Sequence, residues 1–238
     1  MFPIWDDQVK WWYKPVFTWA IIAINIIVFM YQLWLSETGL EQFFMTYATL
    51  PAKIMDGEQW YSLITSMFLH GWRMHIIWNM LFLYVFWDNI ESRMGNIQFL
   101  IFYLLSWVVW SFAHILTDTS SIIPSLWASW AISGVLWAYL VMFPGSRIKM
   151  LHLWSMKTFF VGASQFLLYW IGLQVLTWFG SLASASEWWW VAYFAHIGWF
   201  AIWWIWGAMT KWKYTKGELV SAQSTEIDVS WSDNWRKF

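Results

Sequence analysis

The chain has 238 residues, of which 60% are hydrophobic and only 11% are charged, and its formal net charge is −1. Soluble domains carry about 25% charged residues, so this composition excludes an ordinary water-soluble fold. It predicts an all-α, polytopic membrane protein. Because the chain has no cysteine, disulfides, thiol catalysis and Cys-ligated metal sites are excluded.

Several apolar stretches approach the ~20 residues that a helix needs to cross a bilayer. In chain order they are 16–35, 74–87, 97–116, 130–143, 159–182 and 189–210. The mixed segment 36–69 predicts an interfacial loop with a short amphipathic helix. We therefore expect a cytoplasmic N-terminus (1–15), a membrane domain of six transmembrane helices (16–210) and a polar cytoplasmic tail (211–238).

The distribution of Lys and Arg predicts the orientation of these spans, because basic residues accumulate in short cytoplasmic loops. If the N-terminus is inside, only Lys53 and Arg73 fall on the outer side. The other basic residues then lie on the cytoplasmic side: Lys10, Lys14, Arg93, Arg147, Lys149, Lys157, Lys211, Lys213, Lys216, Arg236 and Lys237. We predict a multi-pass protein of a bacterial-type inner (plasma) membrane, with both termini in the cytoplasm.

Polar side chains at membrane depth are functional candidates because burying them in lipid is costly. The span 130–143 is about 21 Å long at 1.5 Å per residue, whereas the hydrocarbon core is about 30 Å thick. Ser129, at the start of this span, is therefore expected roughly 10 Å below the outer surface. His196 in the sixth span and His75 in the second fall in the same layer, and Asn79 follows His75 one helical turn later.

These four side chains suit acyl transfer. A serine hydroxyl needs a base to take its proton, which a neutral imidazole provides, and the developing oxyanion needs preorganised donors such as Asn or His side chains. Simpler readings exist for each residue alone. Ser129 is compatible with helix packing, His75 and Asn79 with interhelical hydrogen bonding, and Ser133 is a competing nucleophile.

Four sequence blocks resemble the rhomboid family of intramembrane serine proteases, over roughly residues 15–210. "HGWRMHIIWN" (70–79) is similar to the His, His, Asn motif of the second helix in that family. "WASWAISG" (127–134) resembles the Gly-x-Ser-Gly block, and "YFAHIGW" (193–199) resembles the Ala-His-x-x-Gly block of the sixth helix. "DNIESRMGNIQFLIFYLLS" (88–106) resembles the inner turn and third helix.

The resemblance implies a Ser129–His196 dyad, with Ser129 as nucleophile and His196 as base. His75, Asn79 and the backbone N–H of Ser129 would form the oxyanion hole. The family cleaves transmembrane substrates near their outer ends, so transmembrane proteins and the bilayer are the expected partners. No metal, cofactor or nucleic acid is expected. Ser133 departs from family members that place an aromatic residue there. A catalytically inactive relative that binds transmembrane clients is the alternative; a transporter or channel is disfavoured because no charged residue lies within a span.

A second departure concerns tryptophan. Both positions flanking the serine, where the family has glycine, are tryptophan: Trp127 and Trp130. Other family glycine positions show the same replacement: Trp78, Trp87, Trp137 and Trp199. The chain has 27 Trp and 12 Gly. Even extra methylenes in a packed core cost about 1–3 kcal/mol. Several Gly→Trp changes should therefore exceed the roughly 5–15 kcal/mol stability of a domain.

We interpret these tryptophans as a decoding artefact. UGA specifies glycine in some genetic codes and tryptophan in others, so UGA-encoded glycines would print as Trp while GGN-encoded glycines would survive. In this reading residues 127–130 are Gly-Ala-Ser-Gly in the functional protein. Deliberate substitution and a divergent, repacked core are the two alternatives.

The nucleotide sequence tests this interpretation directly. We expect UGA at codons 127 and 130, and peptide masses corresponding to glycine at both positions in protein purified from its native cells. UGG at these codons would exclude decoding and leave the other two explanations.

Overall fold

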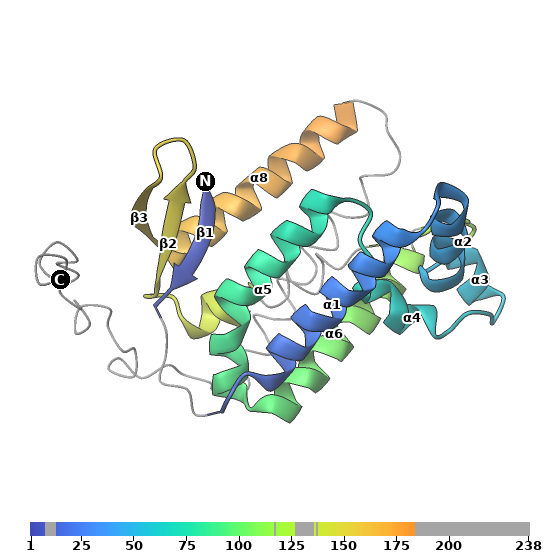
Figure 1. Ribbon diagram of the computed structural model, residues 1–238, viewed down its shortest axis with the longest axis horizontal. Helices are drawn as coiled ribbons and strands as arrows, with labels where there is room; N and C mark the ends of the chain where they lie inside the picture. The colour runs from blue at the N-terminus through green and yellow to red at the C-terminus, as the bar shows by residue number, and fades with distance from the viewer. Residues whose placement is uncertain (8–12, 117, 127–135, 137, 184–238) are drawn as a thin grey trace, which may run out of the picture.

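The computed structural model describes residues 1–7, 13–116, 118–126, 136 and 138–183. This part of the chain is mostly helical and also contains one three-stranded sheet. The long helices are α1 (Val16–Trp34), α5 (Arg73–Met94), α6 (Asn96–Ile115) and α8 (Ala163–Ala183). Helices α1, α5 and α6 contact one another and run side by side, as Figure 1 shows.

Short helices occupy the segment between α1 and α5. They are α2 (Glu37–Tyr47), α3 (Pro51–Met55), α4 (Ser62–Thr65) and the 3₁₀ helix η1 (Ser66–Phe68). The side chain of Ser36 caps α2 by accepting a hydrogen bond from the backbone N–H of Gly39 at 3.2 Å. The prediction of helix within 36–69 is therefore confirmed.

Two predicted spans coincide with helices of the structure. Helix α1 matches 16–35 and α6 matches 97–116, and within the described residues these two helices are long and apolar enough to cross a membrane. The exposed face of α1 carries apolar side chains, including Ile24, Ile27 and Met30. Of the predicted span 130–143, residues 136 and 138–142 are helical, and the span 189–210 lies outside the described residues.

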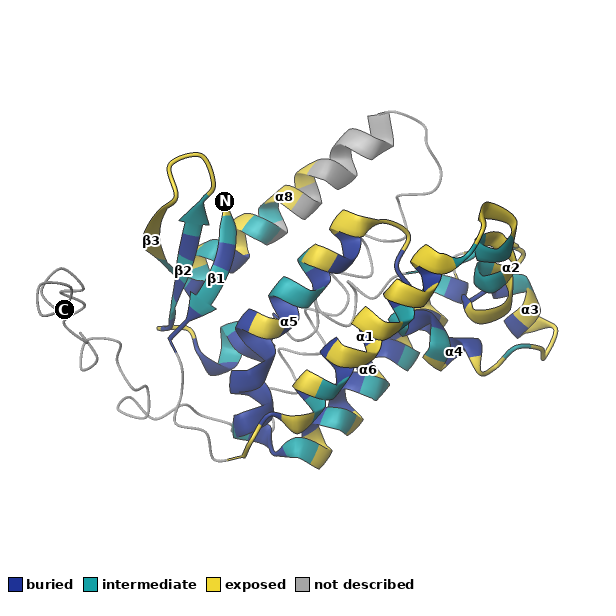
Figure 2. Cartoon of the chain, viewed as in Figure 1, coloured by how far each residue is buried: buried dark blue, intermediate teal, exposed yellow. Residues whose placement is uncertain are grey.

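Helix α5 is longer than the predicted span 74–87, because the polar residues that follow do not end it. Asp88, Asn89, Glu91 and Ser92 are buried inside the protein rather than exposed at a polar break. Figure 2 shows this buried surface concentrated in the half of α5 that ends at Met94. The helix ends at Gly95, whose φ of 87° favours glycine.

The buried carboxylate of Glu91 connects α5 to the first turn of α1. It accepts hydrogen bonds from the backbone N–H groups of Phe17 at 2.8 Å and Thr18 at 2.7 Å, and from the Thr18 hydroxyl at 2.7 Å. The first N–H groups of a helix have no partner within the helix. Glu91 therefore supplies from another helix the cap that α1 lacks in its own sequence.

The sheet was not predicted. Strand β1 (Phe2–Asp6) pairs antiparallel with β2 (Arg147–His152), and β2 pairs antiparallel with β3 (Lys157–Gly162). The fifth predicted span, 159–182, is therefore corrected at its start: residues up to Gly162 belong to β3, and helix α8 begins at Ala163. Phe159, Phe160 and Val161 are apolar in either state, so hydropathy alone does not separate strand from span.

Of the tryptophans at family glycine positions, Trp78 and Trp87 lie in the described part of the chain and the others lie outside it. Trp87 is fully buried, with its ring 5.5 Å from Phe99 and 4.8 Å from Tyr103 between centroids. Its indole N–H has no hydrogen-bond partner among the described residues. The packing around Trp87 fits the repacked-core explanation. The buried N–H carries a cost of about 1–3 kcal/mol that glycine at position 87 would not have.

We expect Glu91→Ala to lower the free energy of unfolding by about 3 kcal/mol, because buried N–H groups of α1 lose their acceptor. The measurement is reversible unfolding of the purified protein in mixed micelles. Glu37→Ala, at an exposed site in the first turn of α2, is the matched control and should change stability by less than about 1 kcal/mol. Equal effects of the two substitutions would contradict the capping role.

Candidate active site

The structure describes two of the four residues predicted to form the active site. His75 and Asn79 lie near the start of α5, and both side chains are buried. Ser129 and His196 lie outside the described residues, as do Trp127 and Trp130. The geometry that follows therefore concerns the predicted oxyanion side of the site, and the Ser129–His196 dyad stays a prediction.

Asn79 is oriented by a histidine outside its helix. Its amide Nδ2 lies 3.0 Å from Nε2 of His70, in the segment between η1 and α5. An amide nitrogen can only donate, so the His70 Nε2 accepts and the ring proton is on Nδ1. Burial lowers the pKa of the His70 imidazole to about 3, which keeps the ring neutral at pH 7. One N–H of the Asn79 amide remains for another acceptor.

His70 is held in place from α1. The side chain of Gln32 donates from Nε2 to the His70 carbonyl at 2.8 Å and accepts from the His70 N–H at 3.2 Å. The ring of Phe29, one turn earlier on α1, meets the His70 ring edge-on. Both His70 and Gln32 were missed as site residues. The first histidine of "HGWRMH" was the available signal for His70, whereas nothing local in the sequence pairs Gln32 with it.

The side chains of His70, His75 and Asn79 form a compact group in which ring nitrogen atoms have no hydrogen-bond partner among the described residues. The His70 and His75 rings are 4.9 Å apart between centroids, in an edge-on arrangement. Nδ1 of each ring is buried without a hydrogen-bond partner among the described residues. Buried polar atoms of this kind call for a partner. Together with the remaining Asn79 N–H, they can donate to an oxygen on which negative charge develops.

A hydrogen-bonded histidine–serine pair precedes the predicted nucleophile, Ser129, in the sequence. Nε2 of His114, in the last turn of α6, is 2.6 Å from the hydroxyl of Ser125. The Ser125 N–H donates to the carbonyl of Thr49 at 3.0 Å. These contacts anchor the segment that leads to Ser129 to both α6 and the loop before α3.

Metal ligation has no support in the described part of the chain, where no group of three or more His, Asp or Glu residues is arranged to hold an ion. The buried histidines instead contact Asn79, Gln32 and Ser125.

Comparison with known proteins bears on this arrangement. The model of the Rhomboid domain family matches residues 57–213, well over half of the chain. The Rhomboid protease GluP of Bacillus subtilis (strain 168) is 32% identical over 135 residues, a stretch that covers 56% of this chain. That alignment covers only 26% of the relative, so the chain matches about a quarter of its length. The matched family range includes the described His70, His75 and Asn79.

Removing the Gln32 support should loosen the His70 segment. We expect Gln32→Ala to speed hydrogen exchange at the His70 amide, because that buried N–H loses its acceptor. The measurement is exchange mass spectrometry on the peptide that contains His70. Gln42→Ala, at an exposed position on α2, serves as the control and should leave this peptide unchanged. Unaltered exchange in both variants would mean that Gln32 does not hold the segment.

Proposed function

This chain belongs to the rhomboid family, and we propose that it is an intramembrane serine endopeptidase that acts through a Ser129–His196 dyad. A rhomboid domain is a multi-pass, mostly helical membrane domain, and the described part of this chain is mostly helical. The observation that carries the proposal is the buried group of His70, His75 and Asn79, which presents unused donors at the start of α5.

In the proposed reaction, His196 takes the proton of the Ser129 hydroxyl as its oxygen attacks the scissile carbonyl. The carbonyl oxygen gains negative charge in the tetrahedral intermediate. The Asn79 amide, the His75 imidazole and the backbone N–H of Ser129 donate to this oxygen. His196 then gives its proton to the leaving amine, and water hydrolyses the acyl-enzyme by the same path. Neither a metal nor a cofactor takes part in these steps.

His70 has a supporting role in this proposal. By accepting from one N–H of Asn79, it fixes the direction of the second N–H, so the donor is oriented before substrate binds. Preorganised donors stabilise a transition state without having to reorient during the reaction. The Gln32 contacts to the His70 backbone extend this support to α1.

We further propose six spans, with both termini in the cytoplasm, in a bacterial-type plasma membrane. The membrane domain would cover 16–210, between a cytoplasmic N-terminus (1–15) and a cytoplasmic tail (211–238). The distribution of Lys and Arg supports this orientation. The substrates would be transmembrane proteins, cleaved near the outer side of the membrane, where the predicted depth of Ser129 places the nucleophile.

A second candidate function has one observation in its favour. If Trp127 and Trp130 are native, two indoles flank the predicted nucleophile where the family has glycine. The chain would then be an inactive rhomboid that binds transmembrane clients. The presence of Ser129, His196, His75 and Asn79 together favours the protease, because a binding protein has no chemical need for all of them.

The dyad is tested by labelling and cleavage. We expect a fluorophosphonate probe to label the parent protein but not Ser129→Ala, and cleavage of a model transmembrane substrate to be lost in Ser129→Ala and His196→Ala. Ser133→Ala should retain both activities. Loss of labelling in Ser133→Ala alone would move the nucleophile to Ser133.

The parent in this assay carries at each Trp position the residue that its codons specify in the native host. The chain with Trp at every printed position is compared in parallel, and we expect it to be inactive, because indoles at 127 and 130 would keep the helices apart. Equal rates for the two chains would show that the tryptophans belong to a working core.

The oxyanion role is tested at Asn79. We expect Asn79→Ala to lower turnover by about 10²–10³, the effect of removing one oxyanion donor. The measurement is the turnover rate in proteoliposomes, with thermal unfolding recorded for the same variant. An unchanged rate would remove Asn79 from the site, and a rate loss matched by a loss of folded protein would assign it to packing.

A further inference from the structure

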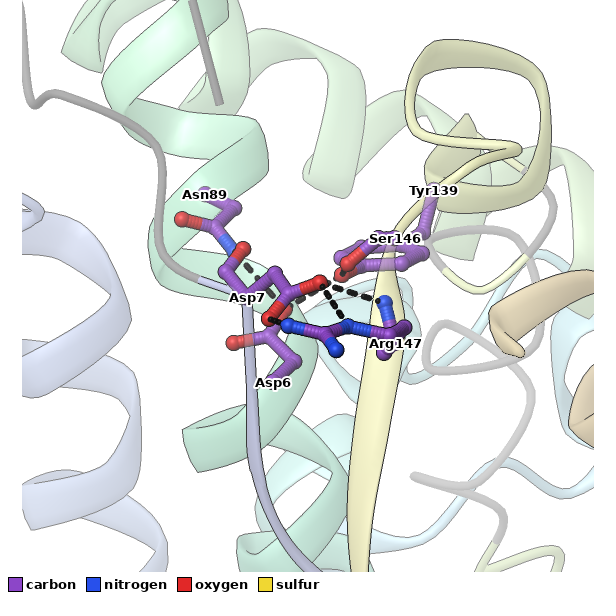
Figure 3. Close-up of polar contacts among 6 residues, drawn as sticks. All are labelled: Asp6, Asp7, Asn89, Tyr139, Ser146 and Arg147. Atoms are coloured by element: carbon purple, nitrogen blue, oxygen red, sulfur yellow. Dashed lines mark hydrogen bonds and ion pairs between the residues drawn. The ribbon is translucent and has the colours of Figure 1, made fainter. Parts of the chain in front are cut away.

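The carboxylate of Asp6, in strand β1, lies buried between two helices. Its Oδ2 accepts a hydrogen bond from the Asn89 side chain at 2.7 Å and another from the Tyr139 hydroxyl. All three side chains are buried. Figure 3 shows the carboxylates of Asp6 and Asp7 between Asn89 on one side and Tyr139 on the other. A buried carboxylate is costly unless hydrogen bonds satisfy it, and here the donors come from different helices.

Asp7, the residue after Asp6, holds β1 in register with β2. The Asp7 N–H donates to the Arg147 carbonyl at 3.0 Å. The Asp7 carboxylate accepts in return from the Arg147 backbone N–H at 2.9 Å and from its Nε at 3.1 Å. The Tyr139 hydroxyl also lies 2.7 Å from the hydroxyl of Ser146. The position of Asp6 is therefore fixed by the sheet and by the residues just before β2.

Asp6 joins the helix that carries His75 and Asn79 to helical residues of the predicted span that begins beside Ser129. Asn89 lies on α5, which bears His75 and Asn79 near its other end. Tyr139 lies in the helical residues 138–142, within the predicted span that begins beside Ser129. Asn89 and Asn79 are separated by about 15 Å of helix, at 1.5 Å per residue. A tilt of one helix against the other at the Asp6 contact would change the approach of these two helices at the site.

We propose that Asp6 is a positioning residue: by joining Asn89 to Tyr139, it sets the distance between α5, with the proposed oxyanion donors His75 and Asn79, and the predicted span that begins beside the proposed nucleophile Ser129. This inference rests on the proposed function for its effect on catalysis. Its structural part, that the Asp6 contact fixes the distance between the two helices, does not depend on that function. Neither Asp6 nor its two partners touches the substrate in this scheme.

The contact chemistry predicts which substitution is tolerated. Because a single oxygen of Asp6 accepts both bonds, the amide oxygen of Asp6→Asn can accept them as well. Asp6→Ala removes the acceptor that Asn89 and Tyr139 share, leaving them their other partners, the Asp7 carbonyl and the Ser146 hydroxyl. Tyr139→Phe removes one of the two bonds and keeps the ring, so its effect should fall between those of Asp6→Asn and Asp6→Ala. The role is therefore one of hydrogen bonding rather than of charge.

The kinetic test compares these variants in the full chain with Thr18→Ala, which removes a buried hydrogen bond between α1 and α5 and leaves the Asp6 contact intact. A misplacement of about 1 Å costs about 10²-fold in rate, so we expect Asp6→Ala to lower kcat by about that factor with KM unchanged. Asp6→Asn should keep kcat within about threefold, and Tyr139→Phe should lower it by about tenfold, the equivalent of one hydrogen bond. A kcat loss in Thr18→Ala equal to that in Asp6→Ala would overturn the proposal, because stability alone would explain both.

A distance measurement tests the contact of Asp6 with Asn89 and Tyr139, the Asp6 clamp, independently of the proposed catalysis. The chain has no cysteine, so spin labels can be attached at Ile77→Cys on α5 and at Gly145→Cys just after the helical residues 138–142. Both positions are exposed, and a Cβ at position 145 would meet no atom within 4 Å. We expect the distance distribution between the labels to broaden in Asp6→Ala and to stay narrow in Asp6→Asn. An unchanged distribution in Asp6→Ala overturns the proposal. If the parent labels no serine, the proposed function fails, and this distance alone decides whether Asp6 sets the approach of the helices.

Discussion

The satisfaction of buried polar groups at the Met94 end of α5 constrains most of the described fold. Four polar side chains there are shielded from solvent, so each needs a hydrogen-bond partner inside the protein: Asp88, Asn89, Glu91 and Ser92. Glu91 finds its partners in the first turn of α1, and Asn89 finds its partner in Asp6 of β1. The Met94 end of α5 thereby fixes the positions of α1, β1 and the helical residues 138–142 relative to one another.

This arrangement gives α5 two distinct ends. The end near Met94 is fixed by hydrogen bonds to the carboxyl groups of Glu91 and Asp6. The opposite end carries His75 and Asn79, where ring nitrogens remain without partners among the described residues. Structures commonly keep unsatisfied groups at sites of chemistry and compensate for them elsewhere. In the proposed function, the Glu91 and Asp6 contacts compensate for the unsatisfied nitrogen atoms of the His70 and His75 rings.

The tryptophans are the point at which sequence and family pattern disagree most. Trp87 shows that the fold can bury an indole among Phe99 and Tyr103, at the cost of an unpaired N–H. The hydrogen bonds that join Asp6 to Asn89 and Tyr139, and His70 to Asn79 and Gln32, involve no tryptophan side chain. Trp72, however, packs against the His75 ring, and Trp78 stacks on Phe2 of β1. These hydrogen bonds are therefore independent of how the codons are read, whereas the proposed activity is not, because Trp127 and Trp130 flank Ser129.

Local sequence determined the parts of this protein that depend on local pattern. Apolar length and composition predicted α1 and α6, and the spacing of His75 and Asn79 predicted their shared helix face. The sheet, the extension of α5 and the partners of Asn79 were decided by tertiary structure. Asp6 and Tyr139 are separated by 133 residues, and no periodicity within a short window encodes such a contact. The predicted spans 74–87 and 97–116 left Asn89 outside both, because hydropathy records only that a side chain is polar, whereas the fold decides whether a buried partner satisfies it.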